Sequence, residues 1–430
     1  MPPSPVPELP QELIDRIIDH VAAEFEDWPG ENLSQCALVS RSFRLRSQMY
    51  IFLSMVIRGG SQRRKEMIKD FLDIIQCNHN IAHYVEELRI DYTAHDHSWI
   101  AQDADFVAVM EKISERPLRK LIFAADLKTN DTCETLPFEP PKPLLDHFFL
   151  PFITPFITSL SLRQLLDVPI DALTTCVNLT DLELLHVELK LPEEGEISRS
   201  RPLKLQRLVH RLAQGALHAL LELTSDGSSA ALDVSQLRSF TVYTDELGGL
   251  QFEQEIIDIS CGTLEELYLI TMQTIANEQF RGTVNLKNAP RLRLLHAHVL
   301  FPKGGLSSIC RTLSTIRARS LDTLFIDAKI GYCDLSYPEV ILEANWTRFC
   351  SQVTRVMSGK GSGFELRMTY SFRDMMNMEL QHCEALLNKR CQLVLAKLRR
   401  EHLKFLDDHP YFSFTISHAI DFDQFFRRRL

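Results

Sequence analysis

The sequence has no uninterrupted apolar run of the roughly 20 residues that a membrane-spanning helix needs. Its first ten residues hold five prolines and an acidic residue, where a secretory signal peptide has a basic region followed by an apolar stretch. The ten cysteines are scattered and no two form a Cys-x-x-Cys pair, which excludes a zinc ribbon or a thioredoxin-like motif. We therefore expect an intracellular protein, cytoplasmic or nuclear, with reduced thiols and no membrane partner.

Positive charge is also scarce, because 47 Lys and Arg residues stand against 57 Asp and Glu residues in a chain of 430 residues. A surface with a net charge of -10 gives a polyanion little counterion release. The composition therefore argues against nucleic-acid partners and against binding to anionic membranes. Hydrophobic residues make up 45% of the chain, which is ample for a large folded core.

Recognisable catalytic motifs are missing as well. No Gly-x-Ser-x-Gly elbow occurs, and the run Gly-Lys-Gly-Ser-Gly lacks the spacing of a phosphate-binding loop. The pairs His79/His83 and His95/His97 have no third ligand at the spacing of a metal site, so we interpret them as surface histidines. The sequence predicts no catalytic residue, no metal site and no cofactor, and we expect that the protein is not an enzyme. An enzyme hidden in residues 150–370 is the alternative.

The start of the chain has the pattern of three short helices. The preceding Pro10 suits the first turn of a helix whose apolar residues recur at helical spacing. These residues are Leu13, Ile14, Ile17, Ile18 and Val21. Asn32 is expected to cap a second helix, and Ser40 or Ser42 a third. Three such helices bury little on their own, so a partner is expected to complete their core.

Two segments within this region carry a more specific pattern: Leu-Pro-Gln-Glu-Leu at residues 9–13 and Leu-Val-Ser-Arg at residues 38–41. Together they resemble an F-box, the helical module that binds Skp1. Where the family commonly has Trp two residues after the Arg, this chain has Phe43. The resemblance implies binding to Skp1, and through Skp1 to a cullin. It assigns this binding to Leu9, Pro10, Leu13, Ile17, Leu38, Val39 and Phe43.

After this module the chain repeats a short unit of the form apolar-x-x-Leu-x-apolar. The units fall at residues 85–90, 118–123, 157–162, 179–184, 237–242, 264–269, 292–297 and 321–326, with a weaker copy at 364–368. The alternation within each unit predicts a short strand with one buried face. Phe240, Leu267, Leu295 and Leu324 are separated by 27, 28 and 29 residues, which is the spacing of long leucine-rich repeats.

Helical periodicity, for example over residues 106–113 and 306–316, places helices between these strands. We therefore expect an α/β fold with three parts. These are a three-helix F-box at residues 1–58, an irregular leucine-rich-repeat-like strand-helix solenoid at residues 59–372, and a C-terminal helical cap and tail at residues 373–430. A single α/β domain with a non-repetitive sheet is the alternative.

In such a solenoid, side chains between the leucines point away from the core on the strand side. These outward positions include Arg89, Asp91, Glu183, Thr241, Tyr243, Tyr268, Arg293 and Asp327. Among them we assign target binding to Tyr243, Tyr268 and Arg293, because aromatic and arginine anchors suit a protein interface. The expected function is that of a substrate-receptor subunit of an SCF-type E3 ubiquitin ligase. A leucine-rich-repeat scaffold that acts outside a ubiquitin ligase is the alternative.

Overall fold

The computed structural model describes most of the chain, in two compact units. The first unit comprises residues 1–203, 222–231 and 430, and the second comprises residues 204–221 and 232–429. The described residues are 9–24, 29–58, 61–92, 99–115, 118–125, 136–137, 145–190, 202–222, 231–244, 250–271, 283–301, 305–330, 338–357, 363–370, 384–404 and 412–418.

The first unit begins with three helices, α1 (Gln11–Glu24), α2 (Pro29–Val39) and α3 (Arg41–Ile51). As predicted, α1 follows Pro10 directly. Ser40 occupies the predicted N-cap position of α3, but its side chain makes no capping hydrogen bond. The prediction for Asn32 is wrong, because α2 begins at Pro29 and contains Asn32 within its first turn. Proline suits this position, where its missing N–H leaves no hydrogen bond unmade.

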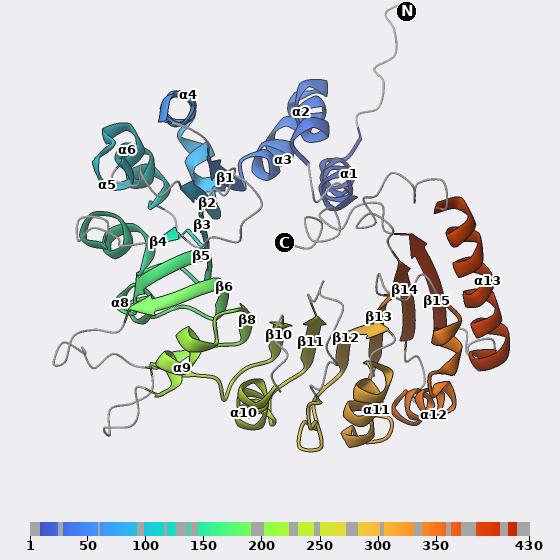
Figure 1. Cartoon of the computed structure of the whole chain (residues 1–430). Coiled ribbons are helices and arrows are strands. Elements are labelled where there is room, and N and C mark those ends of the chain that lie inside the picture. Colours follow the sequence, from blue (N-terminus) through green and yellow to red (C-terminus); the bar gives the residue numbers. More distant parts are fainter. Residues whose placement is uncertain are drawn as a thin grey trace, which may run out of the picture. The chain divides into compact units, whose positions relative to one another are not determined.

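A parallel sheet follows these helices in the first unit (Figure 1). Its strands pair in the order β1 (Ser54–Ile57), β2 (Glu87–Tyr92), β3 (Lys120–Ala125), β5 (Ser159–Pro169) and β6 (Asp181–Lys190), and β4 (Leu136–Pro137) pairs with β5. The connecting segments contain α4 (Ser61–Cys77), η1 (His79–Tyr84), α5 (Trp99–Gln102), α6 (Ala104–Ile113), the π-helical η2 (Leu145–Ile153) and α8 (Asp171–Thr174). Leu88, Leu121, Leu160 and Leu182 stand in register across four strands and are buried, so they form one row of the core.

The second unit also contains parallel strands with helices between them (Figure 1). Its strands pair in the order β8 (Arg207–Arg211), β10 (Ser239–Thr244), β11 (Glu266–Thr271), β12 (Leu294–Phe301), β13 (Thr323–Ile330), β14 (Gly363–Tyr370) and β15 (Phe412–His418). The helices are α9 (Gln214–Glu222), α10 (Gln251–Ser260), α11 (Gly305–Thr315), η4 (Pro338–Glu343), α12 (Trp346–Val356) and α13 (Glu384–His402). Figure 1 shows α10, α11, α12 and α13 along one side of these strands. The short strand β7 (Leu203–Lys204) falls on the boundary between the units, and β9 (Leu232–Asp233) belongs to the second.

A repeated backbone contact fixes the register where each strand starts. The Glu265 carbonyl accepts hydrogen bonds from the N–H groups of Arg293 and Leu294, at 2.8 and 3.1 Å. The Arg293 carbonyl in turn accepts from Asp322 and Thr323, at 2.8 and 3.0 Å. Because the same arrangement recurs from strand to strand, equivalent residues of successive strands line up without a shift.

The prediction of an α/β fold is confirmed, and strands occur at the predicted units. Phe240, Leu267, Leu295 and Leu324 occupy matching positions on neighbouring strands, and all four side chains are fully buried. Phe364 on β14 continues the row. The helices predicted over residues 106–113 and 306–316 are α6 and α11, and their apolar stripes are buried.

Besides the two-residue strands β4, β7 and β9, three longer strands were not predicted from the sequence. β1 lies at the end of the segment assigned to the first module, β8 lies between the predicted units at residues 179–184 and 237–242, and β15 lies within the segment assigned to the helical cap. In β15 the side chains of residues 412–415 alternate between half-buried and exposed. The segment Phe412-Ser413-Phe414-Thr415-Ile416-Ser417 has the alternation of a strand, but it was assigned to the helical cap from the sequence.

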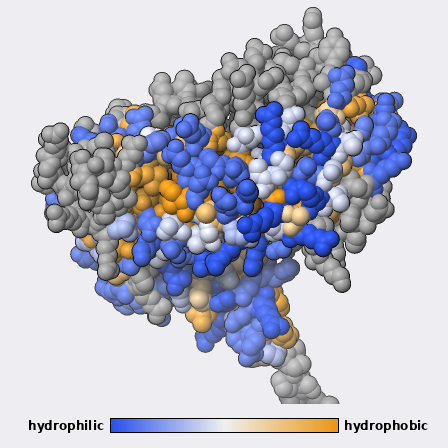
Figure 2. Space-filling model, turned by 90° about the horizontal axis from the view of Figure 1, so that it is seen from below, coloured by the Kyte–Doolittle hydropathy of each residue, from blue (hydrophilic) through white to orange (hydrophobic). Residues whose placement is uncertain are grey.

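The surface mixes polar and apolar residues. On the face drawn in Figure 2, hydrophobic patches lie among larger hydrophilic areas. No helix in the described part of the chain has the length and apolarity needed to cross a bilayer.

The cysteines whose environment the structure describes form no disulfide. Burial raises the pKa of the Cys176 thiol to about 12 and the pKa of the Cys310 thiol to about 11. These two side chains are therefore protonated thiols at neutral pH, which makes them poor nucleophiles.

Candidate functional site

Apolar side chains at the surface gather on the N-terminal helices. Eight of the fourteen exposed large hydrophobic residues in the described part of the chain lie between residues 9 and 53. Leu38 and Val39, at the end of α2, are 75% and 68% exposed. Leu45 and Met49 lie on α3 and are exposed as well. Such a concentration over some forty residues is typical of a surface that binds another protein.

The helices nevertheless have a small core of their own. Ile18, Ala22 and Leu33 are buried in it, and partly buried residues from all three helices pack against them. These are Val21, Cys36, Phe43, Tyr50 and Ile51. The exposed apolar residues therefore take no part in this core, and the module does not need them to hold its helices together.

Polar contacts hold α1 against α3. The Arg46 Nε donates to Asp19 Oδ1 at 2.7 Å, and the Tyr50 hydroxyl donates to the same oxygen at 3.0 Å. The hydrogen bond from Arg46 is the main cause of a lowered pKa for the Asp19 carboxyl. Gln11 Nε2 also donates to the Ser42 carbonyl at 3.0 Å. These contacts set the rotation of α1 about its axis, and this rotation decides which of its apolar residues are exposed.

The rotation of α1 divides its apolar residues into two stripes. Ile14 and Ile18 point into the protein and are buried. Leu13 and Ile17, one helical turn apart, are 45% and 44% exposed. The sequence placed all four on one helical face, and the packing of α1 against α2 and α3 separates them.

Most residues that the sequence assigned to Skp1 binding are accessible. Leu9, Pro10, Leu13, Ile17, Leu38 and Val39 are exposed. Phe43 differs, because its side chain packs against the module's own core. Six of the seven residues are therefore accessible to a partner, and the seventh packs between the helices of the module.

Two of the three residues assigned to target binding share a face of the second unit's sheet. Thr241 pairs with Tyr268 across β10 and β11, so Tyr243 lies one side-chain position beyond Tyr268 on the same face. The Tyr268 ring contacts the His296 ring, with centroids 5.9 Å apart, and its hydroxyl donates to Glu266 Oε2 at 3.4 Å. Both tyrosines are half-buried, so part of each ring remains accessible.

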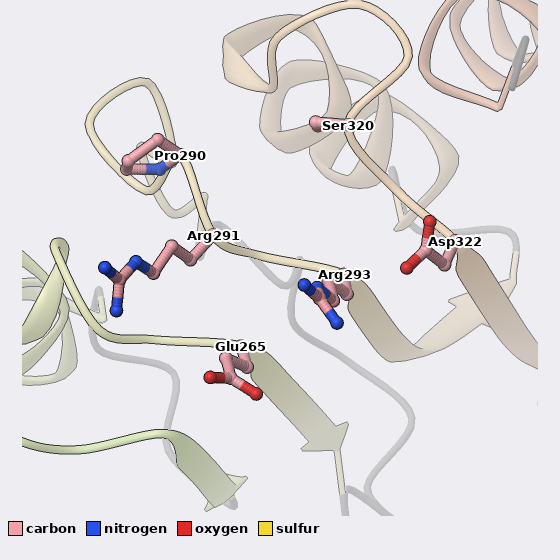
Figure 3. Close-up of a pocket in the computed structure, with 6 residues that line it drawn as sticks. All are labelled: Glu265, Pro290, Arg291, Arg293, Ser320 and Asp322. Atoms are coloured by element: carbon pink, nitrogen blue, oxygen red, sulfur yellow. The ribbon is translucent and has the colours of Figure 1, made fainter.

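Arg293, the third, lies elsewhere, in a pocket at the amino ends of β11, β12 and β13. The pocket has a volume of about 690 Å³, and Figure 3 shows its charged side chains around one hollow. It is lined by Glu265, Pro290, Arg291, Arg293, Ser320 and Asp322. Two guanidinium groups and two carboxylates balance, so the pocket has no preference for an anion over a cation.

A buried polar cluster lies on the tyrosine face of the sheet. His296 Nε2 is 2.7 Å from Asp327 Oδ2, and His298 Nε2 is 3.2 Å from the same oxygen. Burial raises the pKa of the Asp327 carboxyl, but the hydrogen bonds to His296 and His298 outweigh it, and the pKa is lowered from its ordinary value. Asp327 is therefore an anion held by two imidazoles.

The sequence interpretation overlooked this cluster. It placed Asp327 at an outward position but did not connect it with the histidines. The signal was present, because a His-x-His pair on a strand puts both imidazoles on one face. Of the pairs it did weigh, His95 and His97 lie outside the described residues, and His79 and His83 lie on η1 apart from any three-ligand cluster described in the structure.

No protein-family model matches the chain, and a search of curated proteins also finds no match.

Proposed function

We propose that the chain is the substrate-receptor subunit of an SCF-type E3 ubiquitin ligase. In this proposal the helices α1 to α3 are an F-box that binds Skp1. The observation that carries it is the exposure of Leu9, Pro10, Leu13, Ile17, Leu38 and Val39 on a module whose core is already closed. These are the positions at which the sequence resembles the family, and apolar residues held at a surface need a partner to shield them from water.

The second part of the proposal concerns the sheets. We propose that the strands and helices after α3 form an irregular leucine-rich-repeat solenoid over residues 59–372, with residues 373–430 as its cap. Its support is the register of Phe240, Leu267, Leu295 and Leu324, one residue per strand at intervals of 27 to 29 residues. A target protein would bind to the strand face that carries Tyr243 and Tyr268.

The chain would act by proximity and not by chemistry of its own. A receptor that holds a target lysine near a charged ubiquitin-conjugating enzyme converts an encounter between free molecules into a local reaction. The strand face would determine which target protein binds, and the helices α1 to α3 would attach the chain to the ligase.

The test is reconstitution with purified Skp1 and with the Skp1–cullin complex. Copurification of the full chain with both supports the proposal. Binding to Skp1 without the cullin favours a scaffold that acts outside the ligase, and absence of binding to Skp1 contradicts the F-box assignment.

The double change Tyr243→Ala and Tyr268→Ala is expected to weaken target binding at least about tenfold, because aromatic anchors dominate protein interfaces. Skp1 binding should stay unchanged, since the helices that carry it are far along the chain from these strands. The measurement is quantitative affinity purification from cells treated with a proteasome inhibitor, with recovered Skp1 as the internal standard.

The matched control is Leu393→Asp, which changes an exposed side chain on α13. This point change is preferable to removing residues 373–430, because that deletion would strip β15 from β14 and expose the edge of the sheet. Target recovery that survives the tyrosine change but falls with Leu393→Asp would place the binding site on the C-terminal helix.

A further inference from the structure

The cluster of His296, His298 and Asp327 has the composition of a metal centre. Each residue offers one ligand atom, and these atoms all lie within 4.8 Å of one another. The three residues are 3%, 5% and 7% exposed. Two imidazole nitrogens and a carboxylate oxygen are a common set of protein ligands for a divalent transition metal ion.

Strand pairing positions the three ligands. His298 and Asp327 are direct partners across β12 and β13, and His296 pairs with Phe325 one side-chain position earlier. Leu295 and Ala297, on either side of His296, point to the opposite, core face and are fully buried. Because the sheet fixes the backbone on both sides, the ligands are held together before any ion binds.

We propose that His296, His298 and Asp327 bind a Zn²⁺ ion. Bonds of about 2.0 Å at tetrahedral angles separate two ligand atoms by about 3.3 Å. The His298 to Asp327 distance of 3.2 Å already matches this separation. The His296 to Asp327 distance of 2.7 Å has to open by about half an ångström, which a small side-chain rotation provides.

The nitrogens are directed in a way that suits a shared ion. Both Nε2 atoms approach the same carboxylate oxygen, Oδ2, and leave Oδ1 to Arg367, whose Nε is 3.9 Å away. The three ligand atoms therefore lie close together on one face of the strands, as an ion bound by all three requires.

The surroundings are compatible with a dication. Arg367 brings a positive charge, but its Nη2 donates to Glu365 Oε1 at 2.9 Å, so Asp327 and Glu365 together outweigh it. With neutral imidazoles the group carries a net charge of -1. Rings of Tyr268 and Phe325 border His296 and limit the access of water.

Three protein ligands leave a fourth position in a tetrahedral shell. Water or a donor group of a bound molecule can take it. Since Tyr268 contacts His296, the ion would lie on the face to which we assign target binding. The metal proposal itself stands on the geometry of β12 and β13 and does not depend on Skp1.

The test is metal binding by the purified full chain. The protein is stripped with a chelator and titrated with Zn²⁺ against a chromophoric competitor, and the bound metal is counted by mass spectrometry. One equivalent of Zn²⁺ and a tetrahedral absorption spectrum with Co²⁺ are the expected results for the unmodified chain. Less than a tenth of an equivalent would overturn the proposal without recourse to any variant.

Variants assign the ion to these ligands. His298→Gln and Asp327→Asn keep hydrogen-bonding groups in place and are each expected to weaken Zn²⁺ binding at least tenfold and to abolish the Co²⁺ spectrum. Cys310→Ser is the control, because a thiol elsewhere in the same unit could also bind zinc and its loss should change nothing. If either ligand variant misfolds, the other variant and the unmodified chain still show whether Zn²⁺ binds to these residues. Undiminished binding in the folded ligand variants, or loss of binding with Cys310→Ser, would place the ion elsewhere and overturn the proposal.

Discussion

Replacing Leu13 or Ile17 with Asp is expected to abolish capture by Skp1. Both side chains lie on the exposed stripe of α1, one turn apart. In the proposed complex a carboxylate at either position would be removed from water inside an apolar contact without a partner, at a cost of several kcal/mol. A loss of about 3 kcal/mol weakens binding by more than about 100-fold. Calorimetric titration of the full chain with purified Skp1 measures the effect.

Two further variants serve as controls for this experiment, one at an exposed residue outside the module and one in the module's core. Ile259→Asp makes the same change at a side chain on α10 that is 53% exposed, and capture should be retained. Ile18→Asp would instead place the carboxylate in the module's core, so that loss of helix content accompanies loss of binding. Leu13→Asp and Ile17→Asp should lose capture with helix content intact. Normal capture by both would end the F-box assignment.

The strands could be predicted because their buried residues follow a local rule. Each of the strands β10 to β14 contributes alternating apolar residues, and Leu267, Leu295 and Leu324 repeat at nearly constant intervals. The alternation within each strand and the nearly constant spacing between repeats are together enough to place parallel strands in register. β15 alternates apolar and polar residues as well, but it has no Leu-x-x-Leu-x-Leu unit and its segment was assigned to the helical cap.

The sites depended on information that local patterns do not contain. Leu13 and Ile14 are neighbours in one apolar run, and the contacts of Asp19 with Arg46 and Tyr50 decide which is buried. His298 and Asp327 are separated by a helix and two loops, and they meet only because β12 and β13 pair in a particular register. Sequence spacing cannot report a register that long-range packing determines.

A third buried histidine, His210, lies on β8 within the apolar interior of the second unit. The His210 ring stacks on Phe240 with centroids 5.7 Å apart and meets the edge of Phe252. Glu253 Oε1 is 3.7 Å from His210 Nε2, beyond hydrogen-bond distance, and accepts instead from Gln214 Nε2 at 3.1 Å. Burial lowers the pKa of His210 to about 4. The imidazole is therefore neutral in the folded protein at pH values at which it is charged in the unfolded chain.

This neutral imidazole is expected to make stability fall on mild acidification. The unfolded chain takes up a proton at His210 below its ordinary pKa of about 6.5, whereas the folded protein does so only near pH 4, so protons favour unfolding between these values. The contribution to the free energy of unfolding is about 2 kcal/mol between pH 7.5 and pH 5.

The variant His210→Phe keeps a ring against Phe240 and cannot titrate. Urea unfolding at the two pH values should therefore show that its free energy of unfolding falls by about 2 kcal/mol less than that of the unmodified chain. His79→Phe, at an exposed histidine, should behave like the unmodified chain. Equal losses in all three proteins would mean that His210 accepts its proton in the folded state, beside Glu253.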